Sequence, residues 1–230
     1  MAAPERRRDV PSDASPDFSA ERALLRKGVW PVAGVDEAGR GPLAGPVAVA
    51  AVVLDPKKLP AGVDDSKALT ARQREPLFDL ILAKALCVSL AFASAEEIDA
   101  YNIRMATLRA MARAVGALAL RPKIALIDGR DVPPTLECSG RAIIGGDASC
   151  LSIAAASIVA KVARDRLMAR LDAHCPGYGF ANHVGYSTPA HIDALAALGR
   201  SPFHRRSFRS AVIDEPELPG IGPDRKFLTK

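Results

Sequence analysis

The sequence predicts an α/β domain with a central mixed β-sheet, flanking α-helices and a helical C-terminal part. Two apolar runs near the start, at 32–35 and Val47–Leu54, predict strands, and the second, which carries no charge, predicts a buried strand. Further along, short apolar runs alternate with longer segments in which apolar residues recur at helical spacing. Early strands followed by alternating helices and strands are typical of an α/β fold, so a sheet with both parallel and antiparallel pairs is expected.

Local signals mark where the individual elements begin and end. The glycine-rich turn at 38–42 cannot continue the first strand, which should run into Asp36 and Glu37 and pair with the second as a hairpin. Ser94 and Glu97 form a capping box for a helix or helix pair. The first half of the longest helix is rich in alanine and serine, and such small side chains would let it lie close against the sheet. Strands are expected at 32–35, 47–54, 87–93, 123–127 and 141–144, helices at 71–86, 94–119, 149–174 and 188–199, and a loop at 176–188.

The catalytic or binding domain is expected to span 29–211. Residues 1–28 mix charges of both signs with proline, serine and alanine, which predicts a flexible extension with a short helix at 19–27. Residues 212–230 are rich in proline, glycine and charge and predict a flexible tail. The chain shows neither the apolar segment of a secretory signal nor an apolar run near the ~18 residues of a membrane span. A cytoplasmic protein without a membrane partner is therefore expected.

The charge of the chain favours a polyanionic partner. The net charge is +5 and the isoelectric point about 9.2, a modest excess that many proteins without nucleic-acid partners share. Between residues 200 and 209, four arginines and His204 occur without an acid. This arginine cluster is a candidate phosphate-contacting patch, and a solvated basic loop is the alternative.

The cysteines do not predict a metal site. Cys87, Cys138, Cys150 and Cys175 are widely spaced and form no Cys-x-x-Cys pair, so a zinc–thiolate site is not expected. Cys87, Cys150 and Cys175 lie in apolar or small-residue segments and are expected to be reduced packing residues.

Acidic residues follow three of the predicted strands: Asp36 with Glu37, then Asp128, then Asp147. Carboxylates that converge from strand ends make the oxygen-rich site that Mg²⁺ and Mn²⁺ prefer, and two ions ~3.5–4 Å apart can act on a phosphodiester. Carboxylates so close together repel, so without metal at least one should take up a proton more readily.

Each acid also has a simpler interpretation. Asp128, before a glycine, is a typical turn residue, Asp147 or Ser149 is suited to cap the next helix, and Asp36 with Glu37 could be a solvated strand end. Neighbouring residues of a strand point to opposite faces, so Asp36 and Glu37 can serve one site only if the strand ends or bends there.

Six motifs resemble the ribonuclease HII family in their order and spacing. Together they extend over about 32–208, and the first and fifth are long and specific. The resemblance implies a ribonuclease H-like fold. The motifs are Val35-Asp-Glu-Ala-Gly-Arg-Gly-Pro-Leu43, Asp65-Ser-Lys-Ala-Leu-Thr70, Ile127-Asp-Gly129, Gly146-Asp147, Ser152 to Asp165 (SIAAASIVAKVARD) and His204-Arg-Arg-Ser-Phe208.

The resemblance also implies a role for individual residues. The acids that would bind the metal ions and act in catalysis are Asp36, Glu37, Asp128 and Asp147. The turn formed by Gly39, Arg40 and Gly41 would contact the ribose 2′-hydroxyl and the neighbouring phosphate, and Tyr186 would lie beside the nucleotide on the 3′ side. Glycine lets the backbone approach a sugar closely, and the 2′-hydroxyl is what distinguishes RNA from DNA.

Two positions depart from the family pattern. Gly145 and Val184 stand where the family has lysines, before Gly-Asp and before Gly-Tyr. Each change removes a cation near the expected phosphate track, which should weaken binding and flatten its dependence on salt. We expect a lower affinity for hybrids than in typical relatives, with cleavage retained, and the arginine cluster is a candidate to compensate for the two lost cations.

Other polar residues inside the motifs have two interpretations. Lys67 and Lys161 are candidate substrate-binding cations, and Lys161 could instead pair with Asp165 four residues later. Ser66 and Ser152 are suited either to bond the substrate backbone or to cap a helix.

The function that the resemblance implies is endonucleolytic hydrolysis of the RNA strand of RNA–DNA hybrids. Single ribonucleotides embedded in duplex DNA are also expected substrates, cut on the 5′ side to leave 3′-hydroxyl and 5′-phosphate ends, by a monomer that uses Mg²⁺ or Mn²⁺. Three alternatives stand beside it. They are ribonuclease HIII, which usually has an added N-terminal domain and lacks the Gly-Arg-Gly turn; another nuclease of the same fold, such as a junction resolvase; and a non-catalytic hybrid-binding module, which would have lost an acid.

Overall fold

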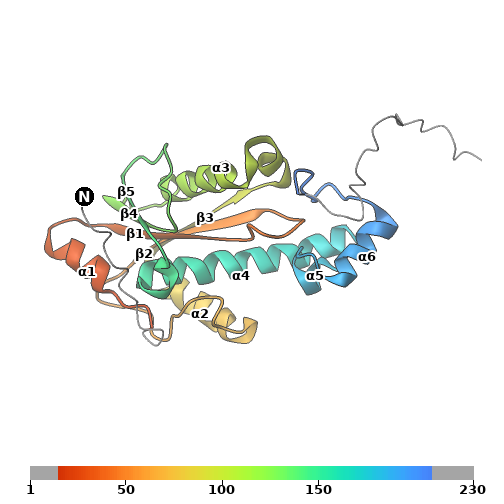
Figure 1. Ribbon diagram of the computed structural model, residues 1–230. Helices are drawn as coiled ribbons and strands as arrows, with labels where there is room; N and C mark the ends of the chain where they lie inside the picture. The colour runs from red at the N-terminus through yellow and green to blue at the C-terminus, as the bar shows by residue number, and fades with distance from the viewer. Residues whose placement is uncertain (1–14, 209–230) are drawn as a thin grey trace, which may run out of the picture.

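A five-stranded mixed sheet forms the centre of the computed structural model, which describes residues 15–208 (Figure 1). The strand order is β3-β2-β1-β4-β5, with β1–β2 and β2–β3 antiparallel and β1–β4 and β4–β5 parallel. The predicted mixed sheet is therefore confirmed. The strands are β1 (Val32–Ala38), β2 (Val47–Leu54), β3 (Ala85–Ala93), β4 (Ile124–Asp128) and β5 (Ser139–Ile143).

Helices cover both faces of the sheet. In Figure 1, α3 lies on one face and α4 on the other, with α2 beside α4 and with α5 and α6 gathered at the far end of α4. The helical C-terminal part is thus confirmed, and none of the helices in residues 15–208 is long and apolar enough to cross a membrane. The helices are α1 (Ser19–Arg26), α2 (Ala71–Lys84), α3 (Ala95–Gly116), α4 (Leu151–His174), α5 (Phe180–His183) and α6 (Pro189–Leu198), with a short 3₁₀ turn η1 (Gly146–Ala148).

The third helix is a kinked pair, one of the two forms expected from its capping box. Ser94 caps its start by accepting a hydrogen bond from the Glu97 amide. Asn102 leaves helical geometry with φ 63°, and its side-chain oxygen accepts a hydrogen bond from the amide of Met105, which begins the second half. The side chain accounts for the start of the second half, because asparagine can act as an N-cap.

Strand β2 is buried on both faces, which explains why its sequence lacks alternating polar residues. One set of its side chains, including Val49 and Val53, packs with α3, and the alternate set, including Val52 and Leu54, packs with α2 and α4. Apolar burial of both faces supplies the main stabilising free energy of such a strand.

The longest helix lies directly against β1, as its small side chains predict. A Cβ atom added to Gly34 would lie 2.1 Å from the backbone carbon of Ser152, so only glycine allows this approach. Val32 packs against Ile153 on the same face. Because strand side chains alternate, the next residue on this face is Asp36, which must face α4.

The N-terminal boundary differs from the expected one at Val29. The predicted short helix is present as α1, but it is part of the packed domain: the Glu21 side chain is fully buried and accepts a hydrogen bond from the Ser152 amide at 2.8 Å. The Leu151 amide donates to the Asp17 carbonyl at 2.9 Å. Both amides belong to the first turn of α4, where helical partners are lacking, so α1 completes that helix. The expected flexible segments at 1–14 and 212–230 lie outside the described residues.

The four cysteines are free thiols, and Cys150 is buried while the other three are partly buried. This agrees with the expected packing role, since burial raises the pKa of the Cys150 thiol to about 11 and keeps it protonated.

Candidate active site

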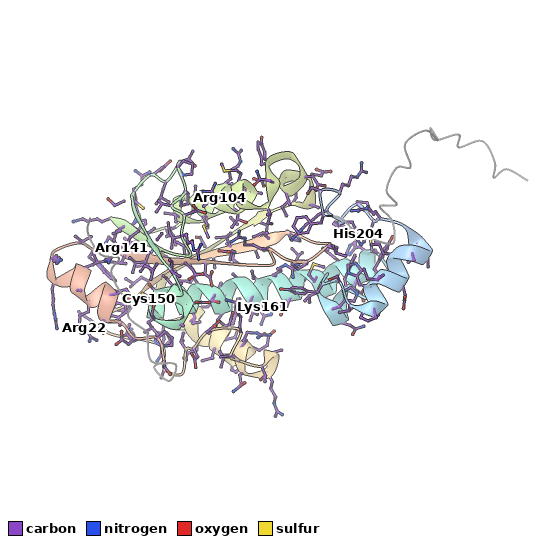
Figure 2. The ribbon with its side chains drawn as sticks, in the orientation of Figure 1. Arg22, Arg104, Arg141, Cys150, Lys161 and His204 are labelled. Atoms are coloured by element: carbon purple, nitrogen blue, oxygen red, sulfur yellow. The ribbon has the colours of Figure 1, made fainter. Side chains whose placement is uncertain are left out.

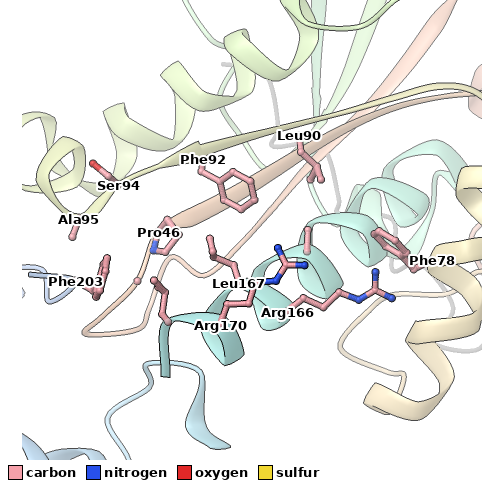
Figure 3. Close-up of a pocket in the computed structure, with 13 residues that line it drawn as sticks. Pro46, Phe78, Leu90, Phe92, Ser94, Ala95, Arg166, Leu167, Arg170 and Phe203 are labelled. Atoms are coloured by element: carbon pink, nitrogen blue, oxygen red, sulfur yellow. The ribbon is translucent and has the colours of Figure 1, made fainter. Parts of the chain in front are cut away.

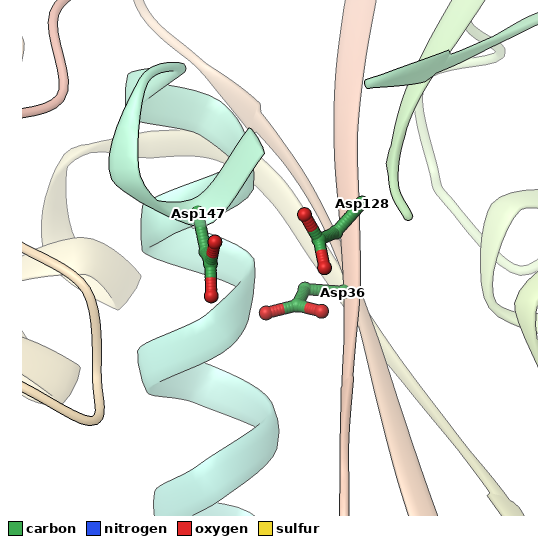
Figure 4. A group of neighbouring side chains, drawn as sticks. All are labelled: Asp36, Asp128 and Asp147. Atoms are coloured by element: carbon green, nitrogen blue, oxygen red, sulfur yellow. The ribbon is translucent and has the colours of Figure 1, made fainter. Parts of the chain in front are cut away.

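Three acidic side chains from separate elements meet at one place. Asp36 of β1, Asp128 at the end of β4 and Asp147 of η1 each offer a carboxylate oxygen, and these oxygens all lie within 4.8 Å of one another. Figure 4 shows the three carboxylates pointing toward one another. The sheet explains the meeting, because β1 and β4 are parallel neighbours whose last paired residues, Val35 and Ile127, directly precede Asp36 and Asp128. We call Asp36, Asp128 and Asp147 the acid cluster.

The simpler interpretations of these acids do not agree with the structure. Asp128 accepts a hydrogen bond from the Gly146 amide at 2.8 Å, so it holds η1 rather than its own turn. Asp147 lies within η1, and the N-cap of α4 is Cys150, where no side chain provides the capping bond. Asp36 is only 3% exposed and is not a solvated strand end.

Burial and mutual repulsion make Asp36 and Asp128 hold protons more tightly than free carboxyls. Burial raises the pKa of Asp36 well above its usual value, and the charges of Glu37 and Asp128 raise it further, while a hydrogen bond from Ser157 opposes this. Burial and the charge of Asp147 likewise raise the pKa of Asp128. The expected easier protonation is therefore confirmed in direction, and a divalent cation would relieve the same repulsion.

Glu37 points to the other face of β1. The strand continues without a bend to Ala38, so Glu37 shares the face of Val35, which packs with α3. Its Oε1 accepts a hydrogen bond from Arg40 at 3.3 Å, whereas Oε2 is buried and has no hydrogen-bond partner within residues 15–208. Burial raises the pKa of Glu37, Arg40 lowers it, and Asp128 raises it, so Asp128 interacts with the acids on both faces. The unpartnered oxygen is suited to a cation beside Asp128.

Lys67 lies next to the acid cluster. Its Nζ donates a hydrogen bond to Asp147 Oδ2 at 2.8 Å, although 77% of the side chain is exposed. Partial burial lowers the pKa of Lys67, but the Asp147 carboxylate outweighs this and the net change is upward. The ammonium group thus compensates one carboxylate in the way that a bound cation would.

The turn after β1 and the loop that carries Tyr186 lie side by side. A Cβ atom on Gly41 would be 3.8 Å from the Tyr186 ring, and this ring is 44% exposed. The Leu43 amide donates to the Gly185 carbonyl at 2.9 Å and joins the two segments. The structure therefore brings together the turn and the tyrosine that the family resemblance singles out, within a few residues of Asp36.

The interpretation of the arginine cluster as a phosphate-contacting patch was wrong for Arg205. Arg205 is fully buried and donates to backbone carbonyls, and Arg200 donates to the carbonyls of Arg205 and Phe208. Arg206 is exposed, and Arg209 lies outside the described residues. The local sequence could not reveal this, because the carbonyls that bind Arg205 come from a turn far away in the chain.

The remaining candidates are buried or have partners within the protein. Lys161 donates to Asp165 at 2.8 Å, which is the structural alternative, and a phosphate contact by Lys161 stays a prediction. Ser66 and Ser157 share a buried hydrogen bond of 2.6 Å, and Ser152 is buried, so neither Ser66 nor Ser152 reaches an exposed substrate. Figure 2 shows Lys161 on the middle of α4, away from His204 at the α5–α6 end.

Sequence reasoning missed Ser157 and Arg164 near the site and assigned Arg205 a different role. Ser157 hydrogen-bonds to Asp36, and the guanidinium groups of Arg164 and Arg205 hold the backbone around the Gly39 turn. All three lie inside the motifs quoted above, so their positions were visible although their contacts were not.

A hollow away from the acid cluster has no acidic residue in its lining. It has a volume of about 630 Å³, lies between β3 and α4, and is lined by apolar side chains such as Leu90, Phe92 and Leu167 together with Arg166 and Arg170 (Figure 3). Without carboxylates in its wall, it offers no ligands for a hard cation.

Comparison with known proteins gives one consistent result. A family model described as Ribonuclease HII matches residues 33–211. A ribonuclease HII of Rhodopseudomonas palustris (strain BisB18) is 59% identical over 218 residues, which cover 92% of this chain and 81% of that protein. The solved ribonuclease H2 from Pyrococcus horikoshii OT3 is similar with a TM-score of 0.67 and 31% identity, over 77% of this chain and 93% of that one. The RNase HII in a PCNA:RNase HII complex from Archaeoglobus fulgidus is similar with a TM-score of 0.66 and 32% identity, over 78% of this chain and 95% of that one.

The fold, the gathered carboxylates and these similarities define a metal-dependent hydrolase of the ribonuclease H class. Because the family model covers most of the chain, and a relative of similar length is well over half identical, the chain belongs to the ribonuclease HII family. It is a ribonuclease H endonuclease that acts on RNA-containing nucleic acid. The resemblance drawn from the six motifs is confirmed, in preference to ribonuclease HIII.

Proposed function

We propose that the chain hydrolyses the RNA strand of RNA–DNA hybrids, including single ribonucleotides embedded in duplex DNA. The cut lies on the 5′ side of the ribonucleotide and leaves 3′-hydroxyl and 5′-phosphate ends. One observation carries the proposal: the acid cluster lies directly beside a glycine turn that faces Tyr186. A phosphodiester at the acids would thus have its ribose at the turn, and one 2′-hydroxyl would suffice for recognition.

The acid cluster would hold one divalent ion, Mg²⁺ or Mn²⁺, and Glu37, which lies on the other face of β1 but interacts with Asp128, would help to hold a second. Close carboxylates, the raised pKa of Asp36 and the unpartnered oxygen of Glu37 support this. When bound, such ions activate water and stabilise the leaving 3′-oxygen. Ser157 orients Asp36, and the Gly146 amide orients Asp128, so that both carboxylates keep their direction when the charge around them changes.

The groups around the acids are suited to hold the substrate. The side chain of Gly41 is a single hydrogen, which lets the sugar approach the backbone, and the exposed Tyr186 ring offers a flat apolar surface to the adjoining nucleotide. Arg40 and Lys67 are both more than half exposed and stand beside the acids, where each can reach a phosphate.

The test is cleavage of a DNA duplex that carries one ribonucleotide, with Mg²⁺, with Mn²⁺ and with a chelator. We expect a single cut on the 5′ side with either metal, none with the chelator, and none in the matched all-DNA duplex. Ends with a cyclic 2′,3′-phosphate would contradict the proposal, because they require attack by the 2′-hydroxyl instead of water.

Two further measurements separate the alternatives. Cleavage of an all-DNA junction in preference to a hybrid would favour a junction resolvase, and tight hybrid binding without any cut would favour a non-catalytic module. The chain is proposed to act as a monomer, for which sedimentation velocity of the free protein and of its complex with a short hybrid is the test.

A further inference from the structure

Two buried arginines bind the turn after β1 without help from any acid. Arg164 of α4 is 1% exposed and Arg205 is fully buried. Within the part of the chain that the structure describes, both guanidinium groups donate hydrogen bonds to backbone carbonyls, and neither forms an ion pair with a carboxylate. Asp99 lies near Arg205, but its oxygens accept from the amides of Arg206 and Ser207. A buried cation needs such a full set of acceptors to offset its desolvation.

Arg205 holds the carbonyls of the turn itself. It donates to the Gly39 carbonyl at 2.6 Å, to the Arg40 carbonyl at 2.8 Å and to the Gly45 carbonyl at 2.8 and 3.0 Å. The planar fork of a guanidinium group can reach three acceptors in fixed directions, which an ammonium group cannot. Burial and the charge of Arg164 lower the pKa of Arg205 to about 9, so the side chain still carries its charge at pH 7.

These bonds set the direction of two amides. In a trans peptide the N–H points away from the carbonyl of the same plane. With the Gly39 and Arg40 carbonyls turned toward the buried Arg205, the amides of Arg40 and Gly41 point the opposite way. Among the loop hydrogen bonds of residues 15–208, none is donated by these two amides. They are therefore available on the side of the turn that faces away from the protein interior.

Arg164 joins the turn to the loop that carries Tyr186. It donates to the Pro46 carbonyl at 2.9 Å, the Ala44 carbonyl at 3.2 Å and the Val184 carbonyl at 3.0 Å. A Cβ atom on Gly39 would lie 1.9 Å from Arg164 Nε, so this glycine is needed to make room for the arginine. The two glycines of the turn thus differ: Gly39 faces the buried guanidinium, and Gly41 faces the tyrosine ring.

We propose that Arg164 and Arg205, the arginine clamp, are positioning residues that set the ribose specificity of cleavage by holding the Gly39–Gly41 turn and Tyr186 in one geometry. The inference rests on the proposed function, since it assumes that the turn and Tyr186 contact the ribonucleotide. It assigns a purpose to two motif residues that neither bind metal nor reach solvent.

The experiment compares Arg205→Lys and Arg164→Lys with the control Arg166→Lys. Arg166 lies on the same helix as Arg164 but is exposed and pairs with Glu75. For each protein, kcat and KM are measured on the single-ribonucleotide duplex, the matched all-DNA duplex is titrated as a competitive inhibitor, and Mn²⁺ binding is followed by calorimetry. Both clamp variants should lose about 100-fold in kcat/KM, as expected for a small misplacement of a substrate-contacting group. The inhibition constant of the all-DNA duplex and the Mn²⁺ affinity should change less than about twofold, and Arg166→Lys should match the parent in all three measurements.

A purely structural role predicts a different pattern. Partial unfolding lowers the ribonucleotide, DNA and Mn²⁺ signals together, so equal losses in all three would overturn the inference. Retention of the parent kcat/KM by folded clamp variants would also overturn it. If neither lysine variant unfolds cooperatively, the arginines maintain the fold itself and the inference is likewise wrong.

The same data separate this inference from the proposed function. A parent enzyme that fails to cut the single-ribonucleotide duplex, or that prefers the all-DNA duplex, would refute the proposed function. A parent that cuts as expected, with clamp variants that do the same, would refute the arginine clamp alone.

Discussion

The acid cluster and the arginine clamp both adjoin the end of β1, but they treat buried charge in opposite ways. In the acid cluster, carboxylates of like charge approach within 4.8 Å, and the cation that pairs with them within the described chain is one largely exposed lysine, Lys67. In the clamp, two cations of like charge are surrounded by carbonyl oxygens that satisfy their donors. The carboxylates of the first region lack a full set of partners, whereas carbonyl oxygens satisfy the donors of the second region.

This difference distinguishes a site that binds an external ligand from a set of contacts that orients the backbone. Uncompensated charge in a buried site costs free energy, so it persists where an external ligand of opposite sign relieves it. Charge that the backbone satisfies needs no ligand and instead restricts the peptides that it contacts. Burial and the charges of Glu37 and Asp128 raise the pKa of Asp36, whereas the clamp obtains its acceptors from the turn that it orients.

The largest expected effect comes from removing one acid. Asp128→Asn should lower kcat by roughly 1000-fold, about 4 kcal/mol of transition-state stabilisation. Without metal at pH 7, the same variant should raise the free energy of unfolding by about 1 kcal/mol, because a repelled negative charge is gone. Cleavage assays and urea unfolding measure the two quantities, and the exposed Asp193→Asn is the control. Near-normal turnover of Asp128→Asn would end the metal-site assignment.

Removing an arginine of the clamp should have the opposite effect on stability. Arg164→Met leaves the carbonyls of Ala44, Pro46 and Val184 without their donors, so the free energy of unfolding should fall by about 2–4 kcal/mol. Arg166→Met removes an exposed arginine from the same helix and should cost less than about 1 kcal/mol. Urea unfolding without metal gives both values, and equal losses would show that the buried carbonyl contacts add nothing.

The two regions should also respond to pH with opposite sign. Near the clamp, the Ser201 amide donates to His204 Nδ1, so His204 Nε2 carries the hydrogen toward His191 Nε2, 3.0 Å away. His191 Nδ1 then donates to the Tyr186 carbonyl at 2.8 Å. This chain of hydrogen bonds requires both imidazole rings to be neutral. Burial lowers the pKa of His204 to about 4, and the charges of His191 and Arg200 contribute to this lowering.

In the unfolded chain, His204 therefore becomes protonated as the pH falls below about 6.5. In the folded chain, it becomes protonated only near pH 4. Stability contributed by His204 is lost as the pH falls through this window, about 2 kcal/mol between pH 7 and 5. For Asp36, whose pKa is raised on folding, lowering the pH restores stability instead. The difference in unfolding free energy between the parent and His204→Gln isolates the histidine, and it should shrink from pH 7 to pH 5. A difference that does not change with pH would contradict the neutral chain of bonds.

The smallest expected effect concerns Val184, which adjoins both the clamp and the substrate loop. Its φ of 45° is left-handed, an unfavourable region for a β-branched residue, so Val184→Lys should be tolerated by the fold. One added phosphate contact should steepen the slope of log binding constant against log salt by about 0.9. Salt titrations of hybrid binding test this, and identical slopes for parent and variant would mean that residue 184 lies off the phosphate track.

The elements that the sequence predicted well are those specified by neighbouring residues. The apolar run of β2, the Ser94 cap of α3 and the small residues that let α4 approach Gly34 all depend on local patterns or short-range sterics. The family motifs indicated which acids are candidate metal ligands. The parallel pairing of β1 with β4 brings two of them, Asp36 and Asp128, together.

Only the tertiary structure decided which partner is contacted by a side chain that has several potential partners. Glu21, in a charged segment expected to be flexible, is buried against the first turn of α4, and Arg205, expected at a phosphate, is buried beneath the Gly39 turn. Glu37 faces α3 because β1 does not bend. The type of residue limits what a side chain can bond, but the partner that it bonds depends on which distant segments the folded chain brings within about 3 Å of it.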